Sequence, residues 1–169
     1  MRSPERVAML EPERVVALSL EGDSVETVLD VGTGTGLFAE AFSACGLAVT
    51  GVDLNADFLD VAQQYVPKGR FVEAPAEALP FADDSFDLVF IAHVLHEADD
   101  PVRVLQEAAR TARKRVVVVE WPFRVEPYGP PLEHRLEPDR IADLARSAGL
   151  SQQAHAVLSH VEIYAFSAA

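Results

Sequence analysis

The amino-acid sequence predicts a single α/β domain built around a mostly parallel sheet. Short uninterrupted apolar runs alternate along the chain with stretches whose apolar residues recur at helical spacing. A glycine-rich turn at 32–36 joins the first run to a helical stretch, an order typical of a strand, a turn and a helix. The length of 169 residues fits one domain, and the 49% of hydrophobic residues suffices for its core.

The expected elements follow in order along the chain. Strands are predicted at apolar runs without polar alternation, since such runs suit strands covered on both faces. They lie at 27–31, 47–52, 70–74, 86–92, 115–121, 153–158 and 161–167. Between and after them, helices are expected over 37–45, 55–65, 100–109 and 138–148. The last two strands are expected to pair as a hairpin across 158–160.

The N-terminal segment contains two expected helix starts, at Pro4 and Pro12. Proline is tolerated at the first helical position because the amide it lacks would have no partner there. Residues 1–24 are therefore predicted to form a short helical preface to a domain at 25–169.

Charge and cysteine content exclude several classes of partner. Fourteen Lys and Arg against 27 Asp and Glu give a net charge of −13, which argues against nucleic-acid and anionic-membrane partners. Cys45 is the single cysteine, so neither an intramolecular disulfide nor a multi-thiolate metal site is expected. With no signal-peptide pattern and no long apolar run, a cytoplasmic location is predicted.

The glycine turn and an acidic residue after the second strand are the main functional signals. Glycines at 32, 34 and 36 let the backbone turn sharply and approach a ligand closely. Asp53 stands 21 positions after Gly32, where a carboxylate accepts hydrogen bonds from ribose hydroxyls. Alternatively, the glycines only make a tight turn and Asp53 only caps a helix.

Four sequence blocks strengthen the ligand-binding interpretation. They are VLDVGTGTG at 28–36, GVDLN at 51–55, AEALPFADDSFDLV at 76–89 and VLHEADDP at 94–101. In this order they resemble the class I S-adenosylmethionine-dependent methyltransferases, in particular the branch of the ubiquinone and menaquinone biosynthesis enzymes. The resemblance runs from about residue 25 to residue 121, and more loosely to the C-terminus.

The resemblance implies a Rossmann-like fold with a seven-stranded, mostly parallel sheet in the order 3-2-1-4-5-7-6 and helices on both faces. It implies S-adenosylmethionine as cofactor, with S-adenosylhomocysteine as product. The implied cofactor-binding residues are Asp30, Gly32, Thr33, Gly34, Gly36, Asp53, Leu54, Ala76, Glu77, Ala92 and His93. Pro75 departs from the family, whose members usually carry an Asp there for the adenine amino group, so adenine recognition by this chain is an open question.

Catalysis and substrate binding are expected near the ends of the fourth and fifth strands. His93 and His96 are candidate bases if the accepting atom starts protonated, and packing of the pocket wall is the alternative. The candidate substrate residues are Trp121, Phe123, Tyr128, His134 and Arg135, although these aromatics can equally pack the sheet edge. The acidic cluster at 97–100 is interpreted as solvated and helix-capping, and no metal is expected.

The leading interpretation is methyl transfer from S-adenosylmethionine to an unidentified small-molecule acceptor, mainly by proximity and orientation. One alternative is a non-catalytic module that binds S-adenosylmethionine or S-adenosylhomocysteine. A less favoured one is a nicotinamide-dependent oxidoreductase. A homodimer is also considered, because so short a chain leaves its pocket open unless a second subunit or a mobile loop closes it.

Overall fold

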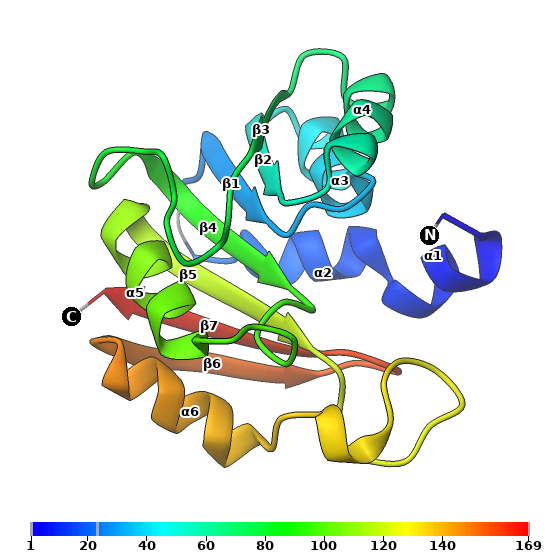
Figure 1. The fold of residues 1–169 in the computed structure, drawn as a ribbon, viewed down its shortest axis with the longest axis vertical. Helices are drawn as coiled ribbons and strands as arrows, with labels where there is room; N and C mark the ends of the chain where they lie inside the picture. Colours follow the sequence, from blue (N-terminus) through cyan, green and yellow to red (C-terminus); the bar gives the residue numbers. More distant parts are fainter. Residues whose placement is uncertain (1, 23, 169) are drawn as a thin grey trace.

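The sheet predicted from the sequence is present, with the strand order implied by the family resemblance. A computed structural model describes residues 2–22 and 24–168, and its seven strands follow the order β3-β2-β1-β4-β5-β7-β6 (Figure 1). The strands are β1 (Thr27–Val31), β2 (Ala48–Asp53), β3 (Arg70–Glu73), β4 (Phe86–Ala92), β5 (Ala112–Glu120), β6 (Leu150–Val157) and β7 (Glu162–Ala168). Only β7 runs against its neighbours, pairing antiparallel with β5 and β6.

Six α-helices and one 3-10 turn flank the sheet in the described residues. They are α1 (Pro4–Leu10), α2 (Pro12–Ser19), α3 (Leu37–Ala44), α4 (Ala56–Tyr65), α5 (Pro101–Thr111), η1 (Leu132–His134) and α6 (Pro138–Ser147). Helices α5 and α6 cover one face of the sheet, and α1, α2 and α3 pack on the other. Both faces of the central strands are therefore shielded from solvent, which explains why every residue of β4 is buried.

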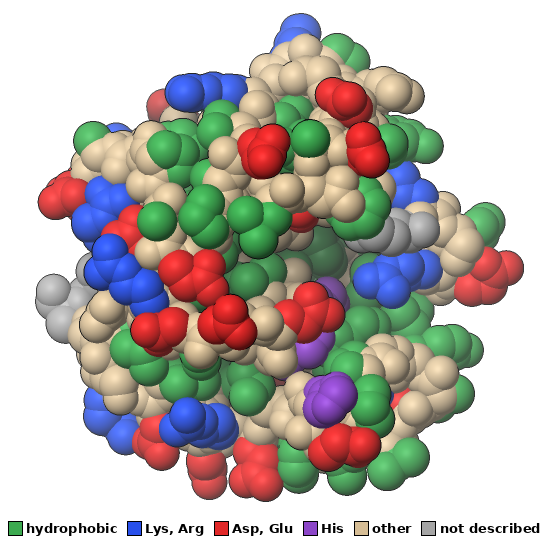
Figure 2. All heavy atoms as spheres, viewed as in Figure 1, with side chains coloured by type: hydrophobic (Ala, Val, Ile, Leu, Met, Phe, Trp, Pro, Cys, Tyr) green, Lys and Arg blue, Asp and Glu red, His purple; other side chains and the backbone are tan. Residues whose placement is uncertain are grey.

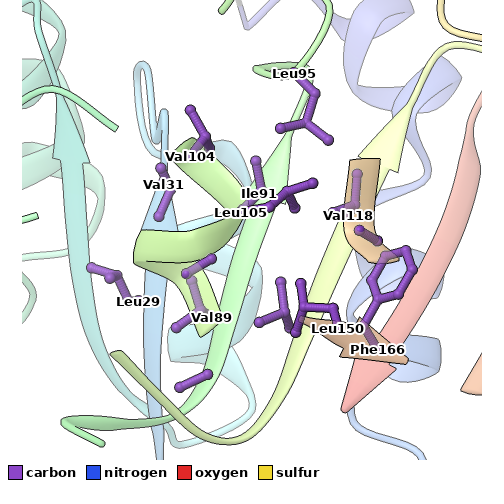
Figure 3. Close-up of a cluster of buried hydrophobic side chains, with 14 of the residues drawn as sticks. Leu29, Val31, Val89, Ile91, Leu95, Val104, Leu105, Val118, Leu150 and Phe166 are labelled. Atoms are coloured by element: carbon purple, nitrogen blue, oxygen red, sulfur yellow. The ribbon is translucent and has the colours of Figure 1, made fainter. Parts of the chain in front are cut away.

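The core on the α5–α6 face shows how the apolar runs are used. In Figure 3, Val89 and Ile91 of β4 lie beside Leu29 and Val31 of β1, and Leu105 of α5 lies with this group. The opposite core contains a cluster of aromatic rings from α3 and β4, in which Phe90 lies 5.0 Å from Phe42 between ring centroids.

The expected helix starts are confirmed. Pro4, Pro12, Pro101 and Pro138 occupy first-turn positions of their helices. Side-chain caps stand where the sequence suggests them, and Asn55 Oδ1 accepts from the amides of the first turn of α4.

The two expected N-terminal helices are divided at Glu11, whose φ of 46° ends α1 and starts α2. Two strand starts differ clearly from the sequence prediction. Strand β5 begins at Ala112 and β6 at Leu150, each three residues earlier than expected. Both extensions contain polar or basic side chains, so an apolar run does not reveal the parts of strands that are held by backbone pairing and not by burial.

The carboxyl ends of β1, β2, β4 and β5 meet at one edge of the sheet. In open α/β sheets ligands bind outside this edge, where the strand order changes direction. Here that point lies between β1 and β4, which places the glycine turn at the centre of the candidate site. Across residues 2–22 and 24–168, no helix combines the length and apolar character needed to cross a bilayer.

Candidate functional site

The glycine turn after β1 leaves no space for a side chain at Gly32. Gly32 has a φ of 70°, in the left-handed region that favours glycine. A Cβ atom added to Gly32 would lie 2.3 Å from Cγ2 of Val94, in the segment that follows β4. The backbone at Gly32 is thus packed closely against the side chain of Val94.

Asp53 connects the turn to the end of β2. Its Oδ2 accepts a 2.8 Å hydrogen bond from the Gly34 amide, and its Oδ1 accepts a 2.9 Å bond from the Asn55 amide. A carboxylate has further lone pairs for ligand hydroxyls after these two bonds. Leu54, the next residue, is 67% exposed, so an apolar side chain stands uncovered beside the carboxylate.

Asp30 lies beneath the turn rather than in it. Its side chain is buried, and Oδ2 accepts a 2.7 Å hydrogen bond from the Thr33 hydroxyl. Burial raises the pKa of Asp30 to about 7, although the bond from Thr33 acts in the opposite direction. This position favours support of the turn over direct contact with a cofactor.

Two adjoining cavities open at this edge of the sheet. The first has a volume of about 590 Å³, and among its lining residues are Leu54, Pro75, Ala76 and Glu77. The second has a volume of about 660 Å³ and reaches from Thr33 and Gly34 to Ala92, His93, His96 and Trp121. Gly32, Asp53, Val94 and Glu97 line both. Figure 2 shows the molecule hollowed here, with histidine atoms at the wall of the hollow.

Most of the predicted cofactor residues therefore lie together. Asp30 and Gly36 do not line either cavity, and both act within the turn and its packing. The departure at Pro75 falls on the wall of the first cavity, at a position that has neither an amide donor nor a polar side chain.

His93 is an unusual histidine. Its φ is 59°, its amide donates to Val119 O at 2.8 Å, and its ring stacks on Trp121 with centroids 4.3 Å apart. Both ring nitrogens are buried, and neither has a hydrogen-bond partner among the described residues. Burial, with a smaller contribution from His96, lowers the pKa of His93 to about 3, so the ring is neutral at physiological pH.

His96 is held by a buried carboxylate. Its Nδ1 lies 2.8 Å from Oε2 of Glu120, and its Nε2 lies 3.5 Å from Oε1 of Glu97. Burial opposes the charged imidazolium, but the hydrogen bond and the charge of Glu120 outweigh it and raise the pKa of His96.

The predicted substrate residues are separated by the structure. Trp121 is buried and lines the second cavity, and Gly129 packs so closely on its ring that an added Cβ would lie 2.7 Å away. Phe123, Tyr128 and His134 are exposed and do not line either cavity, so their role in substrate binding stays a prediction.

Arg135 has a structural role in the loop after β5. Its side chain is only 1% exposed, and its guanidinium donates to Pro122 O and Pro130 O at 2.9 Å and also to Tyr128 O. These donors are turned to backbone carbonyls. Arg135 therefore shapes the loop after β5, and its contact with substrate stays a prediction.

Sequence reasoning missed several cavity residues. Arg6 of α1 lines the second cavity, and its guanidinium forms no hydrogen bond or ion pair with the residues that the structure describes. Nothing in the sequence places Arg6 there, because its position depends on how α1 packs with α2, which itself packs on α3. Val94 and Glu97, by contrast, lie within a block that the family resemblance had marked.

Within the described ranges, no group of three or more His, Cys, Asp or Glu side chains is arranged to hold a metal ion. At the acidic cluster before α5, Asp100 Oδ1 accepts from the Arg103 amide at 3.0 Å, as expected of a helix cap.

Comparison with known proteins was made for the sequence and for the fold. A family model described as a methyltransferase domain matches residues 29–119. The chain is 38% identical over 112 residues to demethylmenaquinone methyltransferase of Thermotoga maritima, covering 64% of this chain and 48% of that protein. It is 35% identical over 105 residues to the enzyme of the same name from Renibacterium salmoninarum, covering 62% and 44%. The chain thus spans about half the length of these relatives.

Solved structures share the fold at low sequence identity. A SAM-dependent methyltransferase from Aquifex aeolicus matches with a TM-score of 0.84 at 21% identity, covering 97% of this chain and 93% of that one. Magnesium protoporphyrin IX methyltransferase from Synechocystis PCC 6803, solved with bound SAH, matches with a TM-score of 0.80 at 16% identity, covering 97% and 84%.

The family match extends over more than half of the chain and includes all or part of each of the four sequence blocks. The sheet order agrees with the solved neighbours. The chain therefore belongs to the methyltransferase-domain family, and its resemblance to class I S-adenosylmethionine-dependent methyltransferases of the ubiquinone and menaquinone branch is confirmed.

Proposed function

We propose that this protein binds S-adenosylmethionine across the glycine turn and transfers its methyl group to a small molecule in the second cavity. The observation that carries this proposal is the position of Asp53. Its carboxylate is oriented by the Gly34 and Asn55 amides and lines both cavities at once. A ligand with a ribose between two dissimilar ends would match this arrangement.

The residues of the first cavity suit an adenosine. The Asp53 carboxylate accepts from the ribose hydroxyls, and the exposed Leu54 side chain supplies an apolar surface for a flat base. Ala76 and Glu77 stand at the far edge of the same cavity. Because Pro75 offers no polar atom from its side chain, the backbone of Ala76 or the side chain of Glu77 is the proposed partner of the base.

The residues of the turn suit the amino-acid end of the same ligand. Gly32 and Gly34 offer backbone groups that no side chain covers, and Ala92 and His93 line the same cavity. When bound, S-adenosylmethionine supplies a methyl group on a positively charged sulfur that leaves as a neutral thioether. The chain then has mainly to hold donor and acceptor in line, which accounts for a large share of such rate enhancements.

Isothermal titration calorimetry with S-adenosylmethionine, S-adenosylhomocysteine and NAD tests the proposal. The wild-type chain is expected to bind the first two and not NAD. Asp53→Ala should weaken this binding by about 1.5–3 kcal/mol, or roughly ten- to a hundredfold. Asp57→Ala, an exposed acidic residue of α4, is the matched control and should bind like wild type.

The outcomes separate the alternatives. A preference for NAD would overturn the proposal in favour of an oxidoreductase. Tight binding of S-adenosylmethionine without methyl transfer to any of a broad set of oxygen, nitrogen, sulfur and carbon acceptors would indicate a binding module.

A further inference from the structure

The first cavity lies between segments that are far apart in the chain. Residues 74–77, which follow β3, form one part of its wall, and residues 97–100, which precede α5, form another. The Pro75 carbonyl accepts from the Ala78 amide at 3.2 Å, so a single turn presents Ala76 and Glu77 to the cavity. Neither segment belongs to a helix or a strand, so their relative position depends on contacts with other parts of the fold.

Arg103 of α5 connects these two segments. Its amide donates to Asp100 Oδ1 at 3.0 Å, and its Nε donates to the Glu77 carbonyl at 3.2 Å. One residue is therefore bonded to a member of each segment. The Arg103 side chain is about half exposed and does not line the cavity, so it acts on the cavity through the backbone of Glu77.

Glu107, one turn further along α5, holds the residues that follow Glu77. Its side chain is buried, and its Oε2 accepts from the Leu79 amide at 2.9 Å. Its Oε1 lies 3.3 Å from a terminal nitrogen of Arg103. The same carboxylate therefore orients Arg103 and binds the segment that Arg103 contacts. Hydrogen bonds to an ionised group are stronger than those between neutral groups, so this anchor is firm.

Arg110 completes the network on the other side of Glu107. Its guanidinium donates to both oxygens of Glu107, at 2.9 and 2.8 Å, and to the carbonyls of Leu79 at 3.1 Å and Phe81 at 2.7 Å. It also donates to Asp83 Oδ1 at 2.8 Å. The hydrogen bonds from Arg110 lower the pKa of Glu107, so this carboxylate stays ionised at neutral pH.

The position of the turn at 75–78 matters because Pro75 offers no polar side chain. The groups left for the base are the Ala76 amide and the Glu77 side chain, and both depend on where this turn lies. The Ala76 amide has no hydrogen-bond partner among the described residues. A hydrogen bond weakens steeply when its distance or angle departs from the optimum. A small shift of the turn would therefore cost most of the recognition of the base.

We infer that Arg103 is a positioning residue that determines how selectively the first cavity recognises the base. The inference rests on the proposed function. Glu107 and Arg110 anchor the segment from Leu79 onward, so the loss of Arg103 releases only the turn at 75–78. The carboxylate of Asp53 and the glycine turn lie outside this network, so recognition of the ribose and of the amino-acid end should be unaffected.

The test compares binding of S-adenosylhomocysteine and S-inosylhomocysteine to the full chain by isothermal titration calorimetry. The two ligands differ only in the base: adenine has an unprotonated N1 and an amino group, whereas hypoxanthine has a protonated N1 and a carbonyl. A backbone amide only donates, so the wild type should prefer adenine. Arg103→Met should reduce this preference by roughly three- to tenfold, the effect of about one hydrogen bond, through weaker binding of S-adenosylhomocysteine.

A purely structural role for Arg103 would give a different result. It would weaken the binding of both ligands by the same factor and leave their ratio as in the wild type. An unchanged ratio in Arg103→Met would therefore overturn the inference, and so would a wild type that binds both ligands equally well.

Amide hydrogen exchange measured by NMR on the ligand-free chain gives an independent readout. In Arg103→Met the Ala78 amide, which is bonded to the Pro75 carbonyl, should exchange faster than in the wild type. The Leu79 amide, which is bonded to the buried Glu107, should keep its rate. An unchanged rate at Ala78 would show that Arg103 does not hold the turn, and would overturn the inference.

Arg146→Met is the matched control. Arg146 is an exposed arginine of α6 that is paired with Asp143 at 2.6 Å and lines neither cavity. This variant should change neither the ratio of the two affinities nor the exchange at Ala78. Circular dichroism checks that each variant is folded.

The failure of this inference differs from the failure of the proposed function. If the wild type binds neither S-adenosylmethionine nor S-adenosylhomocysteine, the proposed function fails. If it binds both and Arg103→Met keeps the full preference for adenine, only the inference about Arg103 is overturned.

Discussion

The Cα of Gly32 faces Cγ2 of Val94 so closely that a Cβ on Gly32 would lie 2.3 Å from it. The turn after β1 and the segment after β4 thus meet without space for one methyl group. Strands β1 and β4 are neighbours at the point where the strand order reverses, and both residues of this contact line both cavities.

Gly32→Ala should destabilise the fold and weaken binding of S-adenosylmethionine. A left-handed φ costs a non-glycine residue about 1–2 kcal/mol, and the clash with Val94 adds to this. Gly46→Ala is the control for backbone strain alone, since Gly46 has a φ of 86° with nothing within 4 Å of an added Cβ. Denaturant unfolding should show a greater loss for Gly32→Ala, partly recovered in Gly32→Ala/Val94→Ala. Equal losses at the two glycines would contradict the steric account.

Asp30 is expected to make stability fall as pH rises. Burial raises its pKa from the reference value of 3.8 to about 7, so between these values the native state holds a proton that the unfolded chain has released. Its contribution to the free energy of unfolding is present below about pH 4 and declines up to about pH 7. Asp30→Asn should remove this slope, as measured by urea unfolding at a series of pH values, whereas the exposed Asp57→Asn should keep it.

Asp87 should contribute in the opposite direction at lower pH. Burial would raise its pKa, but bonds from the Glu26 and Thr27 amides and from Lys114 and Arg113 outweigh it and lower the pKa to about 2. This contribution is present above about pH 4 and is lost as pH falls toward 2. Asp87→Asn should cost about 2 kcal/mol at pH 7 and flatten the acid limb of the unfolding curve. An acid limb like that of wild type would refute the assignment.

Arg135 should govern the loop after β5. Arg135→Met leaves the carbonyls of Pro122, Tyr128 and Pro130 without their donor and removes one of the cations near Glu126. We expect a loss of about 3 kcal/mol and a red-shifted emission from Trp121, the single tryptophan of the chain, as the loop opens. His134→Gln, on the exposed side of the same segment, should change neither quantity. An unshifted emission in Arg135→Met would show that the loop is held by other contacts.

The sequence by itself determined the fold class, the number of strands and the ribose-binding candidate, because each depends on local pattern. Apolar runs locate strands such as β4 that are buried on both faces. The ribose-binding candidate, Asp53 after the turn at Gly32, follows from the spacing of these residues in the chain. The strand order required the family resemblance. The sequence did not predict the first residues of β5 and β6, because these polar residues are held by pairing with partner strands and not by burial.

Only the tertiary structure decided how the site residues divide their tasks. His93 and His96 are three positions apart and look equivalent in the sequence. Yet the ring nitrogens of His93 are buried with no hydrogen-bond partner among the described residues, whereas His96 is paired with Glu120. The sequence alone suggested Arg135 as a substrate contact, and only the structure shows that it donates to backbone carbonyls. No local sequence pattern indicates that Arg6 lines the second cavity. Each of these outcomes depends on contacts between segments far apart in the chain, and local patterns carry no information about such contacts.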